Sequence, residues 1–112
     1  MIEQRDLLLV PFPFSDFSGK KVRPVIVLSN NEFNSFSSDI IVIGVTSNVS
    51  KDRYTISLGN KQLDEGKLLT NCCVKAENIL KLDKELIIKK IGKINIDVLI
   101  EIISKLNQIF KH

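Results

Sequence analysis

The chain has 112 residues, of which 44% are hydrophobic and 26% charged, as in ordinary globular proteins. This length predicts one domain over residues 1–112 and leaves no residues for a second core. The formal net charge of +3 permits contact with phosphate groups without requiring it. The N-terminus lacks a leader pattern and no apolar run approaches about 20 residues, so we expect a cytoplasmic protein that does not enter a membrane.

Apolar runs separated by polar segments predict a series of short β-strands. The first run ends at Pro11 and Pro13, which lack the backbone donor that a strand ladder needs. Pro24 lies inside the second run and indicates an edge, a bulge or the start of a strand. The expected strands cover residues 7–12, 22–29, 39–46, 54–58 and 68–74, with loops over 15–21, 30–38 and 59–66 and a turn over 48–53.

The C-terminal third is less regular and then becomes strongly patterned. Residues 78–82 can pair briefly, and residues 86–91 fit either a short strand or one helical turn. Asn95 can cap a helix, and apolar residues then recur at helical spacing, with polar residues between them. We expect an amphipathic helix of about four turns that packs on the sheet and also meets a partner chain. The whole pattern predicts a small barrel or strongly bent sheet followed by one helix.

Several kinds of chemistry are disfavoured by the residues present. Cys72 and Cys73 are adjacent, so on a strand they point to opposite faces and are poorly placed to bond each other. We expect one buried and one half-buried thiol in a reducing compartment. His112 is the single histidine, which argues against zinc sites and histidine-based catalysis. Asp6, Asp16 and Asp39 could converge on magnesium, although no spacing supports it.

The residue types that remain for a catalytic site are Arg, Lys, Ser, Thr and Asp. Such a set can cleave RNA, because the 2′-hydroxyl is an internal nucleophile next to the phosphorus. The protein then has to orient the attack and stabilise charge on the phosphoryl oxygens. A guanidinium suits this task because its fork can hold two phosphate oxygens.

Five ordered segments, followed by the terminal helix, resemble the MazF/PemK toxin family over nearly the whole chain. Each segment alone is a weak signal, and their order together with the matching length makes the resemblance specific. The segments are Asp6 to Phe12, like the family's opening strand; Val22-Arg23-Pro24 to Ser29, like its Arg-Pro strand; Asn34; Ile41 to Thr46-Ser47; and Glu77-Asn78 to Asp83.

The resemblance implies a mainly β protein with α, a small SH3-like β-barrel of the CcdB/MazF type with a C-terminal amphipathic helix. It implies a homodimeric toxin of a type II toxin–antitoxin system that cleaves single-stranded RNA without a metal or cofactor and binds a cognate antitoxin. By position, Arg23 and Thr46 are the catalytic residues. The residues expected to contact substrate are Asp16, Ser18, Lys20, Lys21 and Ser47.

The sequence departs from the family pattern at several positions. Arg5 replaces the opening Gly, Asn78 stands where Gln is usual, and Leu80 where Arg is usual. Residues 17–21 lack the Glu that many members carry before the Arg-Pro pair. An acid there can serve as a base, so the group that accepts the 2′-hydroxyl proton is left without a candidate.

Alternatives stay open at the level of sequence. Arg23 could be a surface arginine paired with a carboxylate, and Thr46 could be a strand-end hydroxyl whose role is simply to cap a turn. Phe12 is favoured as a core residue, as are Phe33 and Phe36 more weakly, while Phe14 and Phe17 could be core residues or could stack on RNA bases.

The protein as a whole could also be a non-catalytic RNA-binding or a gyrase-inhibiting, CcdB-like toxin-fold protein. Gyrase binding in those relatives depends on Trp-containing C-terminal residues. The absence of Trp, with the ending Ile109-Phe110-Lys111-His112, argues against it.

Overall fold

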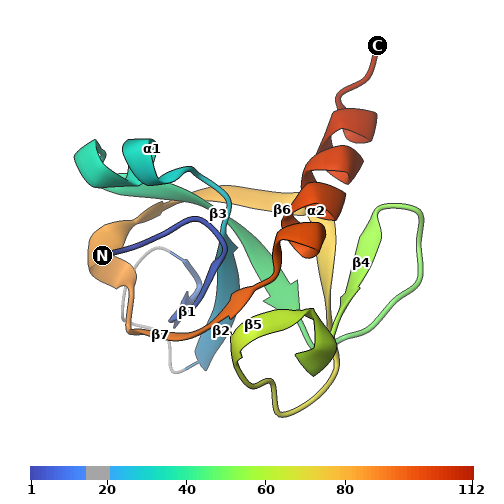
Figure 1. Cartoon of the computed structure of the whole chain (residues 1–112), viewed down its shortest axis with the longest axis horizontal. Helices are drawn as coiled ribbons and strands as arrows, with labels where there is room; N and C mark the ends of the chain where they lie inside the picture. Colours follow the sequence, from blue (N-terminus) through green and yellow to red (C-terminus); the bar gives the residue numbers. More distant parts are fainter. Residues whose placement is uncertain (15–20) are drawn as a thin grey trace.

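The computed structural model describes residues 1–14 and 21–112. Within them, seven antiparallel strands form one sheet in the order β4-β6-β3-β2-β1-β7-β5, which curls into a half-barrel (Figure 1). This confirms the predicted class, mainly β with a C-terminal helix. The elements are β1 (Asp6–Phe12), β2 (Lys21–Val27), α1 (Asn31–Phe36), β3 (Asp39–Thr46), β4 (Thr55–Leu58), the 3-10 turn η1 (Asn60–Gln62), β5 (Leu63–Gly66), β6 (Cys72–Asp83), the 3-10 turn η2 (Lys84–Leu86), β7 (Lys89–Ile94) and α2 (Ile96–Ile109).

The central strands bury side chains on both faces of the sheet. In β2, Val25 and Val27 belong to one apolar cluster, while Ile26 between them belongs to the other. In β3, Val42 and Ile43 divide in the same way. Because successive side chains of a strand point to opposite faces, a strand buried on both sides is a near-continuous apolar run. This is why these strands lack the polar alternation of a half-exposed sheet.

One face of the sheet is covered by α2, which rises from β7 toward the C-terminus and packs on β6 and β4 (Figure 1). The predicted cap is present, because the Asn95 side chain accepts a hydrogen bond from the backbone N–H of Val98 at 3.0 Å. Val98, Leu99, Ile102 and Leu106 are the buried residues of the helix. In the described residues, no helix is long and apolar enough to cross a membrane.

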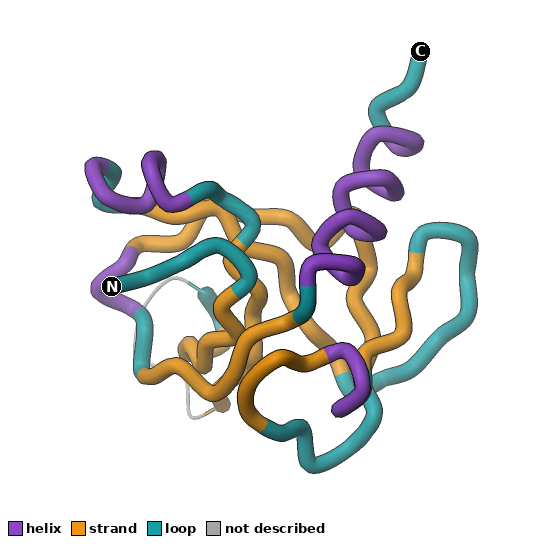
Figure 2. The backbone as a smooth tube through the Cα atoms, viewed as in Figure 1, coloured by secondary structure: helices purple, strands orange, loops and turns teal. Residues whose placement is uncertain are grey.

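Three local predictions are corrected by the structure, and one that the sequence left open is resolved (Figure 2). The expected loop at 30–38 contains α1, because Asn30 caps it by accepting from the N–H of Phe33 at 2.8 Å. The polar connection at 59–66 contains η1 and β5. The segments 68–74 and 78–82 are replaced by the single long strand β6, and residues 86–91 divide between η2 and β7.

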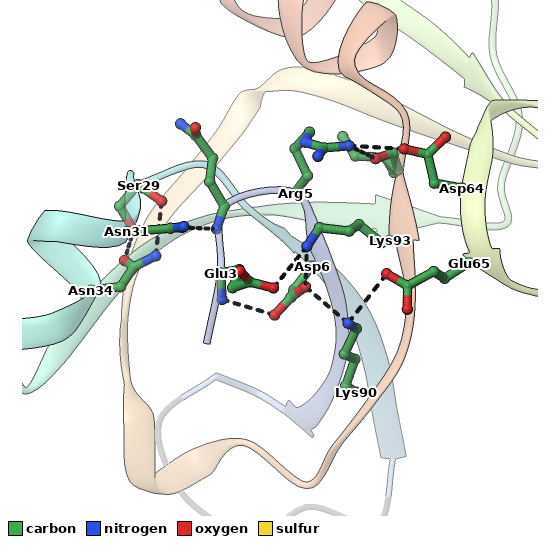
Figure 3. Close-up of polar contacts among 12 residues, drawn as sticks. Glu3, Arg5, Asp6, Ser29, Asn31, Asn34, Asp64, Glu65, Lys90 and Lys93 are labelled. Carbon is green, nitrogen blue, oxygen red and sulfur yellow. Dashed lines mark hydrogen bonds and ion pairs between the residues drawn. The ribbon is translucent and has the colours of Figure 1, made fainter. Parts of the chain in front are cut away.

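Charged side chains cluster where β1 meets β7 (Figure 3). The Asp6 carboxylate is 2% exposed, and its Oδ1 lies 3.4 Å from Lys90 Nζ and 3.6 Å from Lys93 Nζ. Its Oδ2 accepts a hydrogen bond from the backbone N–H of Glu3 at 2.9 Å. Lys93 also binds the Glu3 carboxylate at 2.9 Å, and Lys90 pairs with Glu65 at 3.5 Å. We call these five residues the Asp6 cluster; it joins β1, β5 and β7.

Arg5 has φ = +80°, in the left-handed region that favours glycine. Its guanidinium pairs with Asp64 at 3.0 Å (Figure 3). It also donates a hydrogen bond to the carbonyl of Ile94 at 2.9 Å. The backbone here therefore adopts a conformation typical of glycine, and the side chain contributes contacts with β5 and β7.

Candidate active site

A pocket of about 470 Å³ opens at one end of the sheet face that lies opposite α2. Two of its lining residues are the predicted catalytic pair, Arg23 and Thr46. The complete lining among the described residues is Phe12, Phe14, Arg23, Gly44, Val45, Thr46, Glu77, Asn78, Ile79 and Leu80.

Strand register brings Arg23 and Thr46 to the same face. Val25 of β2 pairs with Gly44 of β3, and Arg23 and Thr46 each lie two residues further along in the antiparallel ladder. Side chains two residues apart on a strand share a face, and that face carries the buried Val25 and Val27. The apolar cluster therefore fills one end of this face, and the two polar residues occupy the open end.

Aromatic rings position the Arg23 side chain. The guanidinium carbon lies 4.9 Å from the centre of the Phe12 ring, a cation–π contact. Phe12 in turn meets Phe14 edge to face, with ring centres 5.3 Å apart. The expectation of a core position for Phe12 is wrong, because its side chain is 38% exposed and lines the pocket. The rings hold the guanidinium without neutralising it, and within the described residues no carboxylate forms an ion pair with it.

Thr46 is the last residue of β3, and its hydroxyl accepts a hydrogen bond within the protein. The Thr46 Oγ1 accepts a hydrogen bond from the backbone N–H of Asn48 at 3.1 Å. Accepting this bond fixes the oxygen at the strand end while the hydroxyl hydrogen can still be donated. Thr46 therefore caps a turn and also supplies a donor beside the pocket.

A wide bulge in β6 supplies the opposite wall. Ile43 pairs with Ile79 and Val45 with Val74, so the single residue Gly44 faces the four β6 residues 75–78. Bulges redirect side chains, and here Glu77 and Asn78 line the pocket. Gly44 has no side chain on this face, and a Cβ there would sit 3.8 Å from the Asn78 Cβ, an ordinary contact distance.

Two further predicted site residues, Lys21 and Ser47, do not join this group. Lys21 is the exposed first residue of β2, opposite Phe12 in the ladder. Ser47 is exposed just after β3 and, like Lys21, is not among the lining residues. Asp16, Ser18 and Lys20 lie outside the described residues, as does Phe17.

The other groups considered for catalysis are occupied or remote. Cys72 and Cys73 are both free and both buried, so the expectation of one half-buried thiol is wrong. Burial, and secondarily the neighbouring Cys73, raises the pKa of the Cys72 thiol, which keeps it protonated and unreactive at neutral pH. Asp39 pairs with Lys81 at 3.7 Å. In the described part of the chain, no three metal-ligating side chains come together.

A second pocket of about 460 Å³ lies beside η1, but much of its polar lining is already satisfied within the protein. Asn60 both donates to the Leu68 carbonyl and accepts from its N–H. Gln62 accepts from the Gly59 N–H at 2.7 Å. Neither an arginine nor a carboxylate lines this pocket among the described residues, which favours the Arg23 pocket as the functional one.

Fold and pocket together define a small half-barrel protein with an arginine held on aromatic rings at the open end of its sheet. The family model described as the PemK-like, MazF-like toxin of type II toxin–antitoxin systems matches residues 3–110. The chain therefore belongs to this toxin family, and the resemblance found in the sequence is confirmed.

Solved structures show the same fold at low sequence identity. MazF in a MazE–MazF complex from Deinococcus radiodurans is 20% identical, with a TM-score of 0.78 over 98% of this chain and 95% of that chain. An endoribonuclease in complex with its cognate antitoxin from a mycobacterial species is 18% identical, with a TM-score of 0.77 over 96% and 93%. The Mycobacterium tuberculosis toxin MazF-mt6 is 15% identical, with a TM-score of 0.76 over 95% and 96%. None of the curated proteins matches the chain.

Sequence reasoning missed Glu77 as a pocket residue. It lies within the family-like segment that runs to Asp83, but at a position where the motif specifies no residue type. The signal that distinguishes it is the bulge opposite Gly44, which depends on pairing between distant strands.

Proposed function

We propose that this protein is a metal-independent endoribonuclease toxin that cleaves single-stranded RNA through attack by the RNA's own 2′-hydroxyl. The observation that carries the proposal is the convergence of Arg23 and Thr46, from different strands, on one open pocket. Membership of the toxin family and the endoribonucleases among the structural neighbours support it.

Each pocket residue has a role in this reaction. Arg23 presents its guanidinium to the scissile phosphate and stabilises the charge that grows on the phosphoryl oxygens. The Thr46 hydroxyl donates a further hydrogen bond to the same oxygens. The exposed Phe12 ring offers a stacking surface for a base while holding Arg23 in place. The predicted contacts from Asp16, Ser18, Lys20, Lys21 and Ser47 would extend the substrate groove beyond the pocket.

The proposal includes partners. We infer a cytoplasmic, single-domain homodimer over residues 1–112 that is held inactive by a cognate antitoxin. The support is a set of exposed apolar residues on α2 and its C-cap, namely Ile96, Ile100, Ile103 and Phe110. Apolar residues exposed together on one helix are typical of a surface covered by another chain. Complexes with antitoxin are known for two of the structural neighbours.

The test is cleavage of a mixed-sequence single-stranded RNA in excess EDTA, beside a DNA of the same sequence. We expect RNA fragments and intact DNA, because only RNA carries the internal nucleophile, and no fragments with Arg23→Ala. If the wild type binds RNA in a salt-dependent manner without cutting it, the protein is a non-catalytic RNA-binding toxin instead. If it neither binds nor cuts RNA but inhibits gyrase, the CcdB-like alternative holds.

A further inference from the structure

We propose that Cys73 is a positioning residue for the reaction: its buried thiol holds the turn after β3, and through that turn it holds the Thr46 hydroxyl beside the pocket. This inference rests on the proposed function, because it gives Cys73 a role in RNA cleavage that acts through Thr46. It also distinguishes the two adjacent cysteines, which have the same chemistry but lie in different surroundings.

Strand register places Cys73 next to Thr46. The β3–β6 ladder pairs Thr46, the last residue of β3, with Cys73, the second residue of β6. Residues directly opposite each other in an antiparallel pair share a face, with their Cβ atoms about 4.5–5.5 Å apart. Cys73 therefore lies on the face of the sheet that carries Thr46. Its side chain is completely buried and belongs to neither of the two apolar clusters, so the thiol lies at the strand end, outside the main packing of the core.

Two hydrogen bonds link the thiol to the Thr46 hydroxyl through one intervening residue, Asn48. The Cys73 thiol donates to the Asn48 carbonyl at 3.6 Å. The backbone N–H of Asn48 donates to Thr46 Oγ1 at 3.1 Å. Asn48 is therefore held on both sides, because its carbonyl is bound from β6 and its N–H is bound to the end of β3. A shift of Asn48 would move the donor that orients the threonine oxygen.

The turn itself has no regular structure that would hold this position. Residues 47–54 between β3 and β4 form neither a helix nor a strand, and residues 47–49 are exposed. The far end of the turn is fixed separately by Asp52, whose carboxylate accepts from the Tyr54 N–H at 3.1 Å and from the Thr55 hydroxyl at 2.7 Å. Exposed backbone outside helices and strands opens most readily. The bond from Cys73 therefore ties the beginning of the turn to the neighbouring strand.

The position of this turn matters for the reaction because Thr46 needs a fixed oxygen. A hydroxyl that accepts from the Asn48 N–H still has its own hydrogen to donate to the phosphoryl oxygens. Such a donor stabilises transition-state charge best when it is already in place and does not reorganise during the step. Cys73 contributes to this preorganisation without contacting RNA, since it is buried and does not line the pocket.

Cys72 provides a matched control at the adjacent residue. Its thiol is also buried and also donates to a backbone carbonyl, that of Thr70 at 3.4 Å. It belongs, however, to the apolar cluster on the α2 side of the sheet, and it pairs with Leu58 of β4. Replacing Cys72 therefore tests the loss of a buried sulfur from β6 without removing a contact to the turn after β3.

The experiment measures kcat and KM for RNA cleavage in EDTA, per folded molecule as determined by urea titration, for the wild type, Cys73→Val, Cys73→Ser and Cys72→Val. Valine fills the space of the thiol but cannot donate, whereas serine keeps a donor. A 1 Å misplacement can cost about 10²-fold in rate, so we expect a smaller loss of about 10-fold in kcat for Cys73→Val. KM should not change, because the threonine bond is made to charge that develops in the transition state. Cys73→Ser should recover most of the rate, and Cys72→Val should cleave like the wild type.

A double-mutant cycle separates positioning from a general structural role. In a Thr46→Ala background, Cys73→Val should cause no further loss of kcat, because the hydroxyl that the thiol positions is gone. The proposal is overturned if Cys73→Val keeps the wild-type kcat, if it loses the same factor in both backgrounds, or if Cys73→Ser or Cys72→Val is as slow as Cys73→Val. A wild type that cuts no RNA would overturn the proposed function itself, and this inference with it.

Discussion

The Asp6 cluster and the Arg23 pocket use charge in opposite ways. In the Asp6 cluster, a buried carboxylate lies between two lysines, and each lysine has a second acidic partner. In the pocket, Arg23 rests on an aromatic ring, and both Arg23 and Glu77 have no ionic partner among the described residues. Matched charges join strands β1, β5 and β7, whereas unmatched charges remain available to a ligand. The contrast supports the proposal that Arg23, which lines a pocket and has no carboxylate partner among the described residues, is available to a ligand.

The largest expected effect is on catalysis. Arg23→Ala should lower the rate of RNA cleavage by about 10²–10³-fold, the usual cost of losing a donor that stabilises transition-state charge. The free energy of unfolding should change little, because Arg23 forms no ion pair within the described residues. Arg53→Ala is the matched control, since Arg53 also stacks on a ring, that of Tyr54 at 5.4 Å, but lies outside the pocket. Equal losses in both variants would contradict the assignment.

The next largest effect is on the free energy of unfolding, and it tests the Asp6 cluster without affecting the Arg23 pocket. Asp6→Asn removes the buried charge between Lys90 and Lys93 and leaves Lys93, whose side chain is 13% exposed, with less compensation. We expect the free energy of unfolding to fall by about 3 kcal/mol, as for a broken buried ion pair. Urea titration measures the loss, and RNA cleavage per folded molecule should be unchanged. A variant as stable as the wild type would show that the cluster does not hold β1 to β7.

A smaller effect isolates the backbone strain at Arg5. Arg5→Gly and Arg5→Ala both lose the contacts to Asp64 and Ile94, but only glycine adopts φ = +80° without strain. We therefore expect Arg5→Gly to be more stable than Arg5→Ala by about 1 kcal/mol. Thermal unfolding of the two variants side by side checks the difference. Equal stabilities would mean that the left-handed conformation is not retained in solution.

The smallest effect concerns pH and the rim of the Asp6 cluster. The hydrogen bond from Lys93 lowers the pKa of Glu3 below its ordinary value of 4.5, so its stabilisation is present above that value and lost as the pH falls through the lowered pKa. The same bond raises the pKa of Lys93 above 10.5, so that contribution is lost only as the pH rises through the raised pKa. Glu3→Gln should therefore be slightly less stable than the wild type at pH 7. The difference should close in acid, and a difference that persists or grows there would contradict this assignment.

How far the sequence predicts this molecule depends on the range of the interactions involved. The runs that became β1, β2 and β3, and the Asn95 cap of α2, are local signals and were read within a few residues. The cap at Asn30 is also a local signal for α1. The polar composition of residues 30–38 nevertheless favours a loop, and a loop is what the sequence predicts there. The sequence predicts two segments in place of β6 because the apolar pattern of this strand breaks at residues 75–78, where the bulge forms.

The candidate site likewise contains residues that local sequence signals predict and residues that only long-range strand pairing brings in. Arg23 and Thr46 stand in recognisable segments, and the register between β2 and β3, together with strand parity, places them on one face. Glu77 reaches the pocket only because four residues of β6 face Gly44, a pairing between segments more than thirty residues apart that no local pattern encodes. The apolar strand predicts a core position for Phe12, although Phe12 is 38% exposed and does not belong to the apolar cluster on that face.

The most direct test of the account is the chemical nature of the ends that the wild type leaves on RNA cut in excess EDTA. Attack by the 2′-hydroxyl, with Arg23 stabilising the phosphoryl charge, predicts a 2′,3′-cyclic phosphate on one fragment and a 5′-hydroxyl on the other. A single 2′-deoxynucleotide at the cut position should abolish cleavage there. Fragments ending in a 3′-hydroxyl and a 5′-phosphate, or cleavage at the deoxynucleotide, would show that water is the nucleophile and would contradict the account.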